Sequence, residues 1–76
     1  MTAAAPPLVM WPQTDGTPVS CLEKLKTLRD NHAELAQIMQ DAFEDAVLMG
    51  VDETAMRRIL ADMVARLQSP KRAGGR

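Results

Sequence analysis

The residues Gly50, Val51 and Asp52 constrain this chain most strongly, because they separate two amphipathic segments. Gly50 suits the left-handed backbone position that closes many helices, since it has no Cβ to clash. Asp52 is a favoured N-cap, and Glu53 places a second acid where the helix dipole favours one. A joint this short predicts that two helices meet there and lie antiparallel to one another.

The segment before the joint has the pattern of one long helix over residues 20–49, which contain neither proline nor glycine. Ser20 and Glu23 fit the capping box that satisfies free amides at a helix start. Apolar positions then alternate spacings of four and three, which keeps them on one face. This stripe comprises Cys21, Leu25, Leu28, His32, Leu35, Met39, Ala42, Ala46 and Met49.

A shorter helix is expected over residues 53–68, where apolar residues again recur at spacings of three and four. Pro70 should stop this helix near Gln68 or Ser69. The apolar residues of this segment are Met56, Ile59, Leu60, Met63, Val64 and Leu67.

The two ends of the chain flank this hairpin. Residues 1–19 contain four prolines and a turn signal at residues 14–17, which predict an extended N-terminal arm. Trp11 and its apolar neighbours should lie across a helix face, or alternatively dock on another protein. Residues 69–76 carry three basic residues and no acid, and we expect a disordered tail. The expected organisation is therefore an arm over 1–19, a helical hairpin over 20–68 and a tail over 69–76.

The difference in helix length predicts self-association. The second helix can cover only about residues 35–49 of the first, at ~1.5 Å per residue. A single core in a chain of 76 residues rarely supplies more than roughly 3–5 kcal/mol, so uncovered leucines would be costly. The expected fold is all-α, a two-helix antiparallel hairpin that dimerises into a four-helix bundle. An arm-capped monomer and a complex with a different protein are the alternatives. The predicted oligomer interface comprises Leu22, Leu25, Leu28, His32 and Leu35.

No residue pattern indicates a metal, a cofactor or an active site. Arg29 stands where a dinuclear helical-bundle motif would need a glutamate, three residues before His32. Cys21 would lie about 16 Å from His32 along the helix, too far to share an ion. We therefore expect a structural histidine, a half-buried cysteine, no cofactor and no enzymatic activity.

Charged residues offer one further candidate site. Asp41, Glu44 and Asp45 cluster near the end of the long helix, where pairing with Arg57 and Arg58 across the hairpin would help fix its register. The alternative is a patch that docks a basic partner. The candidate partner patch comprises Asp41, Glu44, Asp45 and Trp11.

These features predict a small non-enzymatic protein that acts through protein–protein interaction as a homodimer. The alternative is a nucleic-acid accessory protein that uses the basic tail, although a net charge of −1 disfavours binding to nucleic acid. The start of the chain lacks the basic residues of a signal peptide, and no apolar run is long enough to span a membrane. With one cysteine, a cytoplasmic location is expected.

Overall fold

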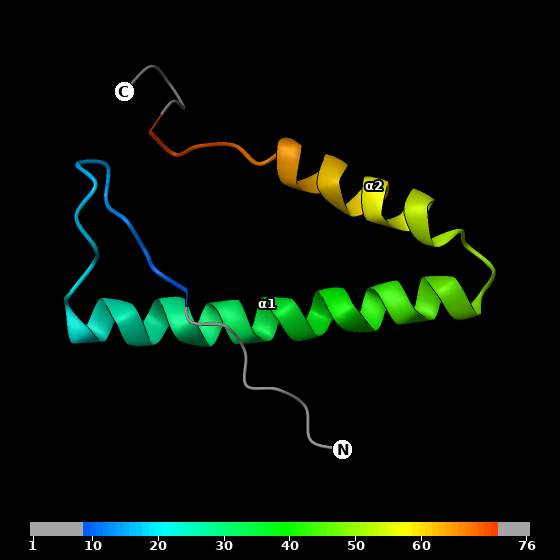
Figure 1. Cartoon of the computed structure of the whole chain (residues 1–76), viewed down its shortest axis with the longest axis horizontal. Coiled ribbons are helices and arrows are strands. Elements are labelled where there is room, and N and C mark those ends of the chain that lie inside the picture. Colours follow the sequence, from blue (N-terminus) through cyan, green and yellow to red (C-terminus); the bar gives the residue numbers. More distant parts are fainter. Residues whose placement is uncertain (1–8, 72–76) are drawn as a thin grey trace. The chain divides into compact units, whose positions relative to one another are not determined.

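The computed structural model describes residues 9–71, which form two helices (Figure 1). Helix α1 spans Leu22–Leu48, and α2 spans Glu53–Ala65. The chain divides into two compact units, Met1–Glu34 and Leu35–Arg76, so that α1 begins in the first and ends in the second. The predicted all-α class, with a long and then a short helix, is confirmed. The predictions made for residues 1–8 and 72–76 lie outside the described residues.

The joint between the helices has the predicted caps. Gly50 has φ of 101°, its amide donates to the carbonyl of Val47 at 3.0 Å, and the amide of Val51 donates to the carbonyl of Ala46 at 2.9 Å. This pair of bonds is the Schellman motif, which satisfies two carbonyls at the helix end. Asp52 accepts a hydrogen bond from the amide of Ala55 at 2.9 Å and thereby caps α2. Hydrogen bonds between neighbouring residues therefore fix where α1 ends and where α2 begins.

Helix α1 begins later than the capping-box prediction. The carbonyl of Cys21 accepts the amide of Leu25 at 2.9 Å, which makes Cys21 the N-cap. A capping box needs its acid three residues after the cap, and that position is Lys24 rather than Glu23. The prediction that Ser20 caps the helix is therefore wrong by one residue.

Helix α2 ends earlier than predicted. Its last residue is Ala65, and Arg66 forms the C-cap with φ −90° and ψ 0°. Pro70 sets an outer limit for the helix, because a proline inside it would clash with the carbonyl four residues earlier. It does not require the earlier stop at Ala65, for which the described part of the chain shows no separate cause.

The described part of the N-terminal arm is a tight hairpin loop, not the extended segment predicted. An isolated antiparallel bridge joins Pro12 and Pro18, and Gly16 takes φ of 91° at the turn. One carboxylate oxygen of Asp15 accepts from the amide of Thr17 at 3.0 Å and from its hydroxyl at 2.7 Å. The predicted turn over residues 14–17 is therefore confirmed, and it reverses the chain before α1.

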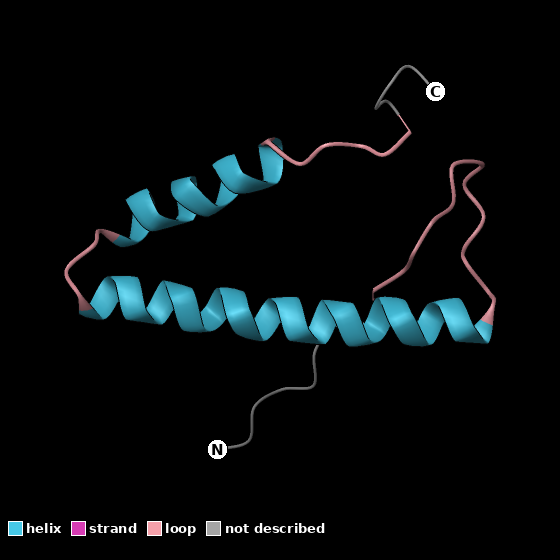
Figure 2. Cartoon of the chain, turned by 180° about the vertical axis from the view of Figure 1, so that it is seen from behind, coloured by secondary structure: helices cyan, strands magenta, loops and turns pink. Residues whose placement is uncertain are grey.

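In the second unit, α2 folds back along the second half of α1, as Figures 1 and 2 show. The contact between the helices leaves no side chain fully buried among the described residues. Each helix therefore contacts the other through a single stripe of side chains. The half-buried apolar residues of this unit are Phe43, Ala46, Val47, Ala55, Met56 and Leu60.

Candidate interaction surface

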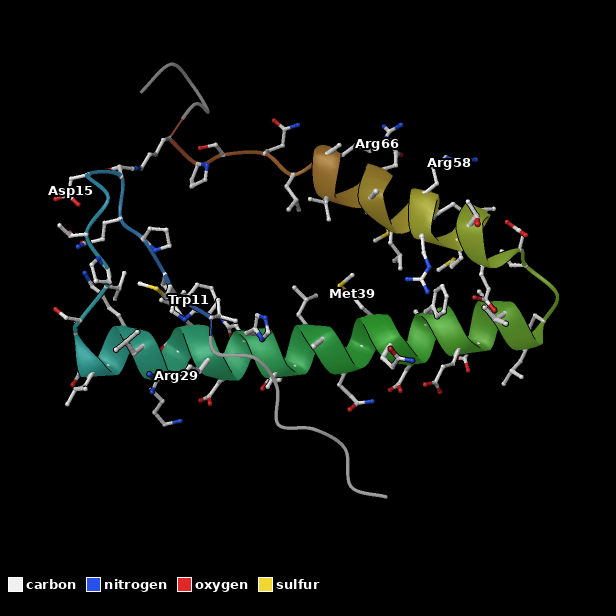
Figure 3. All side chains as sticks on the ribbon, in the orientation of Figure 1. Trp11, Asp15, Arg29, Met39, Arg58 and Arg66 are labelled. Carbon is white, nitrogen blue, oxygen red and sulfur yellow. The ribbon has the colours of Figure 1, made fainter. Side chains whose placement is uncertain are left out.

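Trp11 lies against the first half of α1 (Figure 3). Its ring meets the ring of His32 edge to face, with the centroids 5.9 Å apart and the planes at 84°. Such geometry is favourable for aromatic pairs because a ring edge is positive and a ring face negative. His32 therefore has an aromatic partner within its own unit.

The predicted oligomer interface is partly covered within the first unit. Leu25 and Leu28 are half-buried, and they share a helix face with His32, over which Trp11 lies. Leu22 remains 80% exposed, and Leu35, the one interface residue in the second unit, is 58% exposed. The arm thus supplies part of the cover that was expected from a second copy.

The indole nitrogen of Trp11 has no hydrogen-bond partner within residues 9–71. Among the described residues, Trp11 Nε1 is the side-chain nitrogen or oxygen that is buried and makes no hydrogen bond. A buried N–H with no acceptor costs roughly 1–3 kcal/mol. The Trp11 contact therefore owes its favourable energy to ring area and not to the indole N–H.

The three candidate carboxylates lie on the second half of α1, whereas Trp11 belongs to the first unit. Gln37 donates to Asp41 at 2.9 Å, and Gln40 donates to Glu44 at 2.7 Å. All three acids are exposed, and no lysine or arginine occurs between Arg29 and Arg57 in the sequence. All the charged residues in the second half of α1 are therefore acidic.

The predicted ion pairs across the hairpin do not form. The ion pairs among residues 9–71 are Lys26–Asp30 at 2.6 Å and Asp62–Arg66 at 2.8 Å, each between residues four apart in the chain. Arg57 instead places its guanidinium carbon 4.7 Å from the centre of the Phe43 ring. This cation–π contact spans the hairpin without a carboxylate, because the flat guanidinium can stack on a ring face.

We expect Arg57→Met to lower the free energy of unfolding by about 0.5–1 kcal/mol, the usual worth of an exposed cation–π contact. Methionine keeps most of the apolar stem and removes the charge. Urea denaturation followed by circular dichroism measures the change. Arg58→Met is the control, since Arg58 is its exposed neighbour. Equal losses in both variants would mean that the contact with Phe43 adds no stability.

Sequence reasoning placed Leu35, Ala42 and Met49 in the predicted stripe, but it did not foresee that α2 would leave this part of α1 uncovered. Leu35, Ile38, Ala42 and Met49 are spaced by three, four and seven residues, so they share one face. Ile38 is 64% exposed and Met49 is 82% exposed. Spacing identified these apolar residues, but it could not say which of them α2 would contact.

Cys21 is exposed at the start of α1, so the prediction of a half-buried cysteine is wrong. The backbone amides of Lys24 and then Glu23 hold the pKa of the Cys21 thiol below its ordinary value. The charged form is favoured because these free amides at the helix start point towards the sulfur.

The rate of Cys21 alkylation by iodoacetamide should rise with pH at a lower midpoint in the folded chain than in concentrated urea, because only the thiolate reacts. A lowered folded-state pKa stabilises the fold above the unfolded-state pKa, and this contribution is lost as the pH falls through the folded-state pKa. Mass spectrometry follows the reaction, and Cys21→Ser should not react. Identical midpoints would show that the amides do not act on the sulfur.

Residues 9–71 contain no cluster of three histidine, cysteine, aspartate or glutamate side chains that could hold a metal. Neither described helix has an apolar stretch of the length and low charge that a membrane span requires. The chain matches no protein-family model, no curated protein and no solved structure.

Proposed function

We propose that this chain is a small non-enzymatic interaction protein that acts as a homodimer of helical hairpins. One observation supports the proposal: the described residues include no buried side chain but many large apolar side chains that are exposed. These exposed residues are Val9, Met10, Leu22, Leu35, Ile38, Met39, Leu48, Met49, Val51, Ile59, Met63, Val64 and Leu67.

The energetics favour association. A fully buried leucine, isoleucine or methionine contributes roughly 1.5–3 kcal/mol, while native domains are stable by only about 5–15 kcal/mol. A hairpin that leaves this much apolar surface in water gains too little burial to offset the entropy of ordering its chain. A second copy of the hairpin is the simplest way to bury these side chains, because the same surface of each copy can contact the other.

Asp41, Glu44 and Asp45 form the candidate surface for another protein. They are exposed on a helix segment without a basic residue, so a partner with a basic surface would be favoured. In this proposal the carboxylates select a basic surface, on another protein or on a second copy of this chain.

Sedimentation equilibrium and thermal melting over a wide range of protein concentration test the dimer. We expect a mass of twice the 8.3 kDa of one chain, and a melting temperature that rises with concentration because association and folding are linked. A monomer mass with a cooperative melting transition that does not change with concentration would contradict the proposal.

A further inference from the structure

The second unit presents a continuous apolar face on one side of the helix pair. On α1, the stripe of Leu35, Ile38, Ala42 and Met49 lies about a quarter turn from the stripe that contacts α2, at ~100° per residue. On α2, Ile59 lies about a quarter turn from the half-buried pair Met56 and Leu60, in the same rotational sense. Because the helices are antiparallel, stripes displaced in the same sense lie on the same side of the pair.

The contact between Arg57 and Phe43 supports this placement. On α2, Arg57 is displaced from the half-buried pair in the opposite rotational sense to Ile59. It meets Phe43, which belongs to the contact stripe of α1 and lies about a quarter turn from the Leu35 stripe. The apolar face is therefore distinct from the side that carries the cation–π contact. We call it the flat face and define it as Leu35, Ile38, Ala42, Met49, Ile59 and Met63.

The flat face has the character of an interface between hairpins. None of its residues is charged, and Ile59 and Met63 are 51% and 60% exposed. A second copy laid on this face would give a four-helix bundle, and a two-fold axis in the contact plane allows two arrangements. In one, α1 lies on α1 of the second copy. In the other, α1 lies on α2 of the second copy.

Charge distinguishes the two arrangements. Residues 35–48 carry three acids and no base, a net charge of −3, whereas residues 53–66 carry three arginines and two acids, a net charge of +1. Packed helices lie ~8–10 Å apart, which is close to the ~8 Å screening length at physiological salt. Contact between the two α1 helices would therefore place like charges opposite one another. Contact between α1 of one copy and α2 of the other instead brings opposite charges together.

We propose that the flat face binds a second copy of this chain, with α1 of one copy lying along α2 of the other and both helix joints at the same end of the bundle. This inference rests on the proposed dimer and specifies how it forms. The six residues of the flat face are then buried between the copies, and the acidic second half of α1 lies beside the arginines of the partner's helix.

Disulfide cross-linking tests the arrangement, with Cys21→Ser as the background. Ala42 lies six residues before the end of α1, and Ile59 lies six residues after the start of α2. The proposed arrangement therefore places Ala42 opposite Ile59 of the second copy. Contact between the α1 helices would instead place Ala42 opposite Ala42. Two full-length variants are needed, one with Ala42→Cys and one with Ile59→Cys.

After the two variants are mixed, exchanged and oxidised, mass spectrometry should find the 42–59 disulfide in large excess over the 42–42 and 59–59 disulfides. Excess of the 42–42 disulfide, or no cross-link in a sample that sediments as a dimer, would overturn this inference and leave the proposed function standing. A sample that sediments as a monomer would overturn both.

A charge reversal gives a second test that introduces no cysteine. Asp41→Lys combined with Asp45→Lys should weaken self-association roughly tenfold at low salt, because it places like charges beside the partner's arginines. At high salt the variant and the wild type should associate equally. If the α1 helices faced each other, the same variant would associate more tightly than the wild type, and that result would overturn the inference.

Discussion

Replacing Ile38 with glutamine is expected to weaken self-association by roughly 30- to 1,000-fold. Ile38 is 64% exposed in the single chain, so burying the remainder contributes about 1–2 kcal/mol per copy. Both copies lose this contribution, and each 1.4 kcal/mol corresponds to a factor of ten in the dissociation constant. If the chain worked as a monomer, an exposed substitution of this kind would change stability by no more than about 0.5 kcal/mol.

Leu48→Gln is the matched control for Ile38→Gln. Leu48 is 84% exposed and borders a shallow surface with Gln40, Phe43, Glu44 and Val47, away from the flat face. Glutamine is a good helix former, so neither substitution should disturb α1 itself. Sedimentation equilibrium should show a change of less than about threefold for Leu48→Gln. Equal weakening in both variants would argue against the flat face as the site of contact.

The joint and the helix order could be predicted because they depend on neighbouring residues. Gly50 acts through backbone hydrogen bonds and Asp52 through its carboxylate, and both bond to residues no more than five positions away. The helix ends were less accurate. At the start of α1, Ser20 and Cys21 compete for one cap position, and at the end of α2 Pro70 limits the helix without specifying its last residue.

The candidate site was harder to predict because it depends on residues far apart in the chain. The sequence predicted that Trp11 lies across a helix face, but not that the reversal around Gly16 brings it to His32. Arg57 has a long flexible stem that can reach several partners, and the choice of Phe43 over a carboxylate is set by the packing of two helices. Spacing rules find apolar stripes, but they do not say which stripe meets which helix.

Replacing Trp11 with alanine is expected to lower the free energy of unfolding by about 2 kcal/mol. Full removal of a core tryptophan costs roughly 3–5 kcal/mol, and Trp11 is only half-buried. Its edge-to-face contact with His32 contributes to the loss. Urea denaturation followed by circular dichroism, at one fixed protein concentration, measures the change.

Trp11→Phe separates the ring from its N–H. Phenylalanine retains an aromatic ring for His32 and removes the buried Nε1, which has no acceptor in the described part of the chain. Because an unsatisfied buried donor costs roughly 1–3 kcal/mol, its removal offsets the smaller ring area. We therefore expect Trp11→Phe to be as stable as the wild type or more stable. A loss as large as that of Trp11→Ala would mean that the indole N–H has an acceptor in solution, and that the first unit depends on that hydrogen bond more than on ring contact.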